Sequence, residues 1–194
     1  MNYLNYCKSR DAAWNILIDL NIHTLPIKIV QVCKALGIKV KMYKSTDGND
    51  GYCKMYPNEP IIFVNSLCSI PRQRFTVAHE LGHIILRHIG KYDLINREPS
   101  SHDNPIETEA NIFASRLLAP ACVLHELGVK SPSDISKICE ISLQSAEFRY
   151  KRLLQLEERN QQFIQKYGRG CFYLSPLERQ VCSQFETFIK ESKL

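Results

Sequence analysis

The segment from Ser69 to His88 constrains this chain more than any other part of the sequence. Ser69 can cap a helix and Pro71 suits its first turn, so we predict a helix that continues to about His88. Within it, the run His79-Glu80-Leu81-Gly82-His83 holds two histidines four residues apart. Residues four apart share one face of a helix, so both imidazoles can reach a common point.

Capping residues, hydrophobic periodicity and turn residues predict the other elements. We expect further helices at about 11–19, 26–36 and 105–119, two helices within 131–159, a last amphipathic helix from Ser175, and strands at 38–42, 52–56 and 61–64. In the last helix one side carries the apolar residues Leu177, Val181, Phe185 and Phe188. Together these elements predict an α+β fold, with a small, mostly antiparallel sheet packed on helices and a C-terminal helical hairpin.

We divide the 194 residues into a core over 1–130, a hairpin resembling a helix-turn-helix over 131–160, and a C-terminal tail over 161–194. The formal net charge of +5 is too small to require a nucleic-acid partner. No apolar run approaches the ~20 residues that a transmembrane helix needs, and the N-terminus lacks the features of a secretory signal. We therefore expect a cytoplasmic protein with no membrane partner.

Eight cysteines are scattered along the chain, and none forms a C-x-x-C pair. That spacing does not suit a cysteine zinc site, and a reducing compartment favours free, mostly buried thiols.

The histidine pair predicts a metal site, because histidines at this spacing on a helix are typical zinc ligands. Glu80 lies about 100° around the helix from His79, beside the open coordination position. A carboxylate there can act as general base on a water whose pKa zinc lowers toward ~7. The alternative is a chance match, with both histidines solvated or satisfied in a core. Ala78 and Gly82 favour the metal site, since their small side chains permit close approach of a second element.

A third ligand must come from elsewhere in the chain. Leu86 and Ile89 stand where the metzincin pattern needs glycine and histidine, so that pattern is excluded. We predict Glu107, because Glu107, Ala110, Asn111 and Ala114 form a narrow face that suits packing against the Gly82 side of the first helix. The alternative for Glu107 is a capping box with Asn104, and His102 and Asp103 are the other candidate ligands.

Three neighbouring polar residues receive other roles. Asn111 can accept a hydrogen bond from the second ring nitrogen of a ligand histidine and so fix its tautomer. His88 lies five residues after His83 and points off the ligand face of a continuous helix, so we predict a surface or capping role. Glu109 falls on a different face from Glu107, and we predict a surface ion pair for it.

These motifs resemble the ImmA/IrrE family of metallo-endopeptidases. The resemblance rests on the segment 74–83, on Glu107-x-Glu109-Ala110-Asn111-x-Phe113-Ala114, and on Leu117-Leu118-Ala119-Pro120. It implies a zincin-like core in which Glu107 is the third metal ligand. It also implies that Asn111 supports the ligands by hydrogen bonding without itself binding the metal. It further implies, as substrate, a helix-turn-helix repressor of a phage, a mobile element or a stress regulon. The predicted cofactor is zinc, with manganese as the alternative.

In zincin folds an extended peptide pairs with an exposed strand edge. We predict Ile61–Val64 as that edge, with Ile61, Phe63 and Asn65 contacting substrate; the alternative is a purely structural strand. A rival function is a DNA-binding or metal-sensing regulator that uses the 131–155 hairpin without proteolysis. Glu147, Glu157 and Glu158 dilute the basic side of that hairpin, so direct nucleic-acid binding is not expected. The group that stabilises the oxyanion is left open between His102 and a tyrosine.

Overall fold

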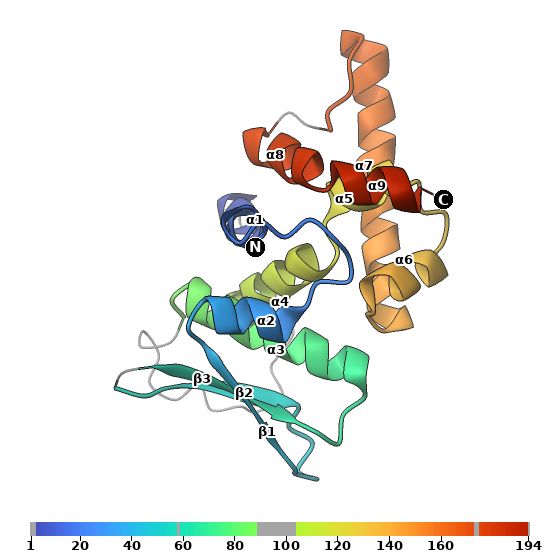
Figure 1. Ribbon diagram of the computed structural model, residues 1–194. Helices are drawn as coiled ribbons and strands as arrows, with labels where there is room; N and C mark the ends of the chain where they lie inside the picture. Colours follow the sequence, from blue (N-terminus) through green and yellow to red (C-terminus); the bar gives the residue numbers. More distant parts are fainter. Residues whose placement is uncertain (1–2, 58, 89–103, 173–174, 194) are drawn as a thin grey trace. The chain divides into compact units, whose positions relative to one another are not determined.

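A computed structural model describes residues 3–57, 59–88, 104–172 and 175–193 (Figure 1). Along the chain the elements are α1 (Tyr3–Asp19), α2 (Ile29–Ala35), β1 (Lys39–Tyr43), β2 (Gly51–Met55), β3 (Pro60–Asn65), α3 (Ile70–Ile85), α4 (Pro105–Leu118), α5 (Ala121–Leu127), α6 (Pro132–Cys139), α7 (Leu143–Tyr167), α8 (Pro176–Gln184) and α9 (Glu186–Ser192). The fold is α+β with one small sheet, as the sequence predicted.

The chain groups into two compact units. Unit 1 contains residues 1–13 and 28–118, and unit 2 contains residues 14–27 and 119–194. Unit 1 holds the whole sheet with α2, α3 and α4, and unit 2 holds α5 to α9. The finer division into core, hairpin and tail stays a prediction.

The sheet of unit 1 is mixed, which corrects the prediction of a mostly antiparallel sheet. Its strand order is β1-β3-β2, with β1 parallel to β3 and β2 antiparallel to β3. The loop 44–50 causes this arrangement, because it carries the chain from β1 across the end of β3 to the other side of that strand. Asn65 secures the crossing: its Nδ2 donates to the carbonyls of Ser45 (2.7 Å) and Asn49 (3.1 Å).

The same topology corrects the predicted docking edge. β3 pairs with a strand on each side, so Ile61–Val64 has no main-chain edge left for a peptide. Ile61 and Asn65 are buried, and Asn65 uses its side chain on the loop. Phe63 stacks on Tyr52 of β2, with 4.7 Å between the ring centroids. Ile61, Phe63 and Asn65 therefore build the sheet, and the edge-strand role predicted for them is wrong.

Helices α2 and α3 pack against the sheet, and α4 packs on α3 (Figure 1). Two glycines permit this close packing. A Cβ on Gly51 of β2 would meet the Phe63 carbonyl oxygen and Thr76 Cγ2 of α3, both at 2.5 Å. A Cβ on Gly82 of α3 would lie 3.0 Å from Phe113 Cδ1 and 3.3 Å from Ala110 Cα of α4. The predicted close approach at Gly82 is therefore present, and its partner is the predicted small-residue helix.

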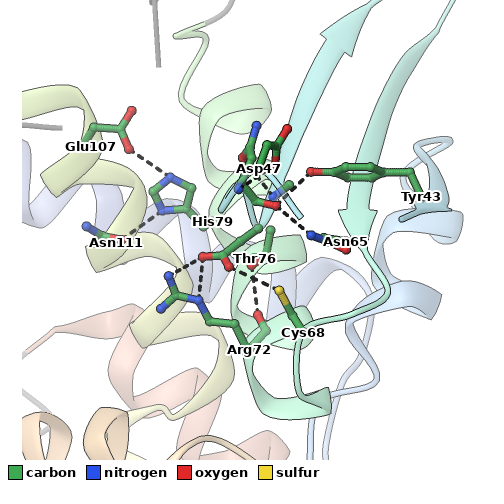
Figure 2. A network of polar contacts seen from close by, with 12 residues as sticks. Tyr43, Asp47, Asn65, Cys68, Arg72, Thr76, His79, Glu107 and Asn111 are labelled. Carbon is green, nitrogen blue, oxygen red and sulfur yellow. Dashed lines mark hydrogen bonds and ion pairs between the residues drawn. The ribbon is translucent and has the colours of Figure 1, made fainter. Parts of the chain in front are cut away.

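An ion pair fastens the loop 44–50 to the first turn of α3. Arg72 Nε donates to Asp50 Oδ2 at 2.6 Å, and Cys68 Sγ donates to Asp50 Oδ1 at 3.2 Å (Figure 2). Burial raises the pKa of Asp50, but the hydrogen bonds from Arg72 and Cys68 outweigh it and hold that pKa below its ordinary value.

Several element boundaries differ from the predictions. α1 begins before residue 11, α2 begins at Ile29 rather than residue 26, and α7 continues to Tyr167. α5 was not predicted at all. The last helix is interrupted at Phe185, which separates α8 from α9. α3 ends at Ile85 instead of His88, and that early end matters most for the candidate site.

Among the described residues of unit 2, the regular elements are all helices, joined by turns and loops. α6 and α7 occupy the segment predicted as two helices, and Glu140 joins them with a left-handed φ of 51°. Ser131 and Ser142 cap them by accepting from the main-chain N–H of Asp134 and Ser145.

All eight cysteines are free thiols, as predicted, but only Cys33, Cys122 and Cys139 are buried. Within the described segments, no helix combines the length and apolar character needed to cross a bilayer.

Candidate metal centre

Helix α3 directs two imidazoles at one point. His79 and His83 are separated by one helical turn, and their Nε2 atoms lie 3.0 Å apart. Their rings meet edge to face, at 71° with 4.7 Å between centroids. The helix places them there because its Val77, Ala78 and Leu81 are buried and fix its rotation.

Glu107 on α4 brings a carboxylate to the same point. Its Oε2 lies 3.1 Å from His79 Nε2, and its Oε1 lies 3.4 Å from His83 Nε2. The N-terminus of α4 is capped by Asn104, whose Oδ1 accepts from the main-chain N–H of Ile106 at 3.0 Å. The Glu107 carboxylate is thus directed at the histidines, which is the predicted ligand arrangement rather than a capping box.

The electrostatics of this cluster favour an anionic Glu107. Hydrogen bonds with His79 and then His83 hold the pKa of Glu107 well below its ordinary value. At His79, burial lowers the pKa, but Glu107, the charge of Glu80 and Asn111 together raise it above its ordinary value. A carboxylate that stays ionised next to two imidazole nitrogens is a donor set suited to a cation.

Asn111 holds the second nitrogen of His79. Its Oδ1 lies 2.9 Å from His79 Nδ1, one helical turn after Glu107 on α4. Figure 2 shows the His79 ring between Glu107 and Asn111. Because an amide oxygen only accepts, His79 carries a proton on Nδ1, so Nε2, the nitrogen that faces Glu107 and His83, is the one left for a metal ion. The hydrogen bond predicted for Asn111 is therefore present.

The three donor atoms fit a tetrahedral metal ion. Two imidazole nitrogens and one carboxylate oxygen all lie within 4.8 Å of one another. Bonds of about 2.0–2.1 Å in tetrahedral geometry separate ligand atoms by about 3.3–3.4 Å, and the observed separations approach that value. Two imidazole nitrogens and one carboxylate oxygen are a donor set that suits zinc.

Glu80 lies beside the cluster, between His79 and Leu81 in sequence, and is only 6% exposed. As the residue after His79 it projects about 100° away from that ligand around the helix axis. The negative charge of Glu80 raises the pKa of His79, so the Glu80 carboxylate lies near the cluster. It is not one of the three donor groups.

His88 and Glu109 correct two predictions. Both side chains are buried, and His88 Nε2 lies 3.2 Å from Glu109 Oε2. His88 Nδ1 lies 3.1 Å from His83 Nδ1. The surface role predicted for His88 and the surface ion pair predicted for Glu109 are therefore wrong. Burial lowers the pKa of His88 below its ordinary value, although Glu109 acts in the opposite direction.

The early end of α3 explains the misplacement of His88. Arg87 adopts a left-handed φ of 59°, its N–H donates to Ile84 O at 3.1 Å, and the His88 N–H donates to His83 O at 2.9 Å. This is the Schellman pattern of a helix C-terminus, which folds the residue after the left-handed one back over the last turn. Position 87 holds arginine where glycine or asparagine usually takes the left-handed conformation, so the sequence lacks the strongest signal for this helix end. The main-chain N–H of His88 takes part in this turn, while its side chain contacts His83 and Glu109.

The other candidate ligands, His102 and Asp103, lie outside the described residues. His102 is also a candidate for stabilising the oxyanion, and that candidate therefore lies outside the described residues too.

Comparisons with known proteins place the chain in a family. The sequence model of a peptidase family described as the IrrE N-terminal-like domain matches residues 33–151, more than half of the chain. The chain belongs to this IrrE-like peptidase family. The match includes every residue of the cluster and confirms the predicted ImmA/IrrE resemblance.

Two relatives of this IrrE-like chain are named radiation response metalloprotease IrrE. The protein from Deinococcus radiodurans is 33% identical over 101 residues, which are 46% of this chain and 30% of that protein. The protein from Deinococcus deserti is 37% identical over 76 residues, which are 37% of this chain and 26% of that protein. Each match therefore covers less than a third of the relative's own length.

Proposed function

We propose that this IrrE-like chain is a zinc-dependent endopeptidase. The observation that carries the proposal is the convergence of His79 Nε2, His83 Nε2 and a Glu107 carboxylate oxygen beside a buried Glu80. Membership in a peptidase family supports it, as do relatives named metalloproteases. Manganese, which accepts the same nitrogen and oxygen donors, is the other metal to be tested.

His79, His83 and Glu107 would hold the ion. When bound, zinc supplies Lewis-acid chemistry, lowering the pKa of a water to about 7 and polarising a carbonyl oxygen. Asn111 keeps the His79 Nε2 lone pair directed at the ion by accepting from Nδ1–H.

Glu80 is the proposed general base. Its carboxylate would take a proton from the attacking water and later donate it to the leaving amine, so that one side chain serves both transfers. Its burial supports this role, because a carboxylate in a water-poor site transfers protons without competition from bulk solvent.

The proposed substrate is a helix-turn-helix repressor protein of a phage, a mobile element or a stress regulon. The motif resemblance to the ImmA/IrrE family supports this choice, together with the radiation response that the relatives' names include. We further propose that the enzyme acts in the cytoplasm, where such a repressor is found and where its eight free thiols would stay reduced.

The rival function, a DNA-binding or metal-sensing regulator, has no comparable support. The family match extends to residue 151, so it includes α6 and the first part of α7 within a peptidase family. Salt-dependent retention of the whole protein on DNA would be the observation in favour of the rival.

The proposal is tested with the purified protein, zinc and a candidate helix-turn-helix repressor, such as one encoded in a neighbouring gene where one is found. We expect discrete fragments by mass spectrometry. Glu80→Gln should keep the zinc content but lower the cleavage rate by about 10²–10⁴-fold or more, because only the proton transfer is removed. Glu191→Gln on α9 changes an exposed carboxylate and serves as the matched control. Cleavage by Glu80→Gln at the wild-type rate would contradict the assignment.

A further inference from the structure

A hydrogen-bonded chain of three buried side chains extends outward from His83. His83 Nδ1 contacts His88 Nδ1 at 3.1 Å, and His88 Nε2 contacts Glu109 Oε2 at 3.2 Å. The three residues are 6–8% exposed. Nothing in the proposed proton transfers uses His88 or Glu109, so the chain needs an explanation of its own.

The Glu109 carboxylate determines which ring nitrogens of His88 and His83 carry protons. An ionised carboxylate only accepts hydrogen bonds, so the proton of His88 must lie on Nε2, facing Glu109. In a neutral imidazole the other nitrogen is then an acceptor, so His88 Nδ1 accepts and His83 Nδ1 donates. With Nδ1–H used in this way, Nε2 is the nitrogen of His83 that is left to bind a metal ion, and that atom faces His79 and Glu107.

We propose that His88 and Glu109 are positioning residues that fix the tautomer and ring orientation of His83 for metal binding. The inference rests on the proposed metal role of His83. It assigns His83 the same arrangement as His79, whose Nδ1–H is held by Asn111. For His83 the acceptor is a second histidine, and Glu109 decides which of its nitrogens accepts.

The turn that ends α3 brings His88 into hydrogen-bonding contact with His83. On a continuous helix His88 would project about 140° away from His83, since five residues rotate by about 500°. The left-handed Arg87 instead folds the chain back, so that His88 binds His83 through both its main chain and its ring. α4 supplies Glu109 two residues after Glu107, so a single helix provides the third ligand and the outer end of the chain.

The experiment measures zinc affinity by competition with a chromophoric chelator, for the whole protein without substrate. His88→Leu removes the acceptor for His83, and we expect its zinc dissociation constant to rise about 10- to 100-fold. His88→Asn places an amide oxygen near the position of Nδ1, as Asn111 does for His79, and should restore most of the affinity. Glu109→Leu should weaken binding, and should weaken it no further in the His88→Leu background, because Glu109 acts through His88.

The matched control is His125→Gln, which removes a histidine–carboxylate contact with Glu157 in unit 2. We expect its zinc affinity to equal that of the wild type. Thermal unfolding of each metal-free variant verifies that the protein is folded before affinity is compared.

A measurement on the wild type gives a result that needs no variant. In zinc-loaded protein, ¹⁵N chemical shifts of the histidine rings should show the His88 proton on Nε2 and the His83 proton on Nδ1. A His88 proton on Nδ1 would overturn the inference. Equal zinc affinity in the wild type, His88→Leu and Glu109→Leu would overturn it too, as would equal losses in His88→Leu and His88→Asn, which indicate packing alone. A wild type that binds no zinc would remove the proposed function as well.

Discussion

At His79 both ring nitrogens are engaged, Nδ1 by Asn111 and Nε2 by the point shared with His83 and Glu107. A ligand held in this way does not have to select its tautomer or rotamer when the metal arrives, so less conformational entropy is lost on binding. The affinity of the site should therefore depend on Asn111, although Asn111 offers nothing to the metal.

Asn111→Leu tests this dependence. We expect the zinc dissociation constant to rise about 10- to 100-fold, because His79 Nδ1–H loses its acceptor. Asn111→Asp keeps an acceptor oxygen and should bind zinc at least as tightly as the wild type. Both constants are measured by chelator competition, and equal affinity in the wild type and Asn111→Leu would contradict the role given to Asn111.

At this scale the sequence predicted the inner residues and missed the outer ones. Helical spacing pairs His79 with His83 and Glu107 with Asn111, because each pair lies one turn apart on its own helix. The choice of Glu107 as third ligand over a capping role also used the family resemblance. His88 was misplaced because its position depends on where α3 ends. Glu109 was misplaced with it, since its burial depends on His88.

Among the secondary-structure elements, α3 affects the site most, through the turn at its C-terminus. Arg87 takes a left-handed conformation that disfavours residues with a Cβ by about 1–2 kcal/mol. A position that tolerates this cost is held by its surroundings, here by the two main-chain hydrogen bonds that join the turn to α3.

Arg87→Gly is predicted to raise the free energy of unfolding by up to about 1 kcal/mol, since glycine relieves the left-handed strain while losing more chain entropy. Its zinc affinity should stay at the wild-type value. Arg87→Val should lower both stability and zinc affinity, because a β-branched residue resists this backbone conformation. Arg87→Ala shows the effect of losing the side chain alone. Denaturant unfolding measures the free energy of unfolding of each variant. If Arg87→Val were as stable as Arg87→Gly, the left-handed conformation at residue 87 would be contradicted.

Among the elements, local signals predicted well and nonlocal ones did not. Alternating residues and turn chemistry located all three strands, but strand order depends on pairing between distant segments, which no local pattern encodes. Pro120 was interpreted as a helix stop, and it is also the residue that precedes α5. Because proline suits both positions, the sequence did not distinguish an end from a new beginning.

For the whole molecule, the assignment of the cluster to unit 1 has a thermodynamic consequence. All three proposed ligands lie within residues 28–118. A ligand that binds only the folded state stabilises it by about 2.7 kcal/mol at a free concentration 100 times its dissociation constant. Zinc should therefore stabilise the segments that must stay folded for the ligands to converge.

Hydrogen exchange with and without zinc tests this consequence. Added zinc should slow amide exchange in α3 and α4, and should leave α8 and α9 of unit 2 unchanged. His83→Gln, which removes one ligand, should show little change in either unit. Slowing confined to α6 and α7 would instead indicate that metal binds elsewhere, as a metal-sensing regulator with a site in those helices would require.

The central claim is that two imidazoles and a carboxylate hold one zinc ion. Zinc K-edge X-ray absorption of the purified protein tests it most directly, because eight free cysteines offer a different set of ligands. We predict one zinc per chain with nitrogen and oxygen neighbours at about 2.0–2.1 Å, and zinc loss in Glu107→Leu. A sulfur shell at about 2.3 Å, or full zinc retention in Glu107→Leu, would contradict the account.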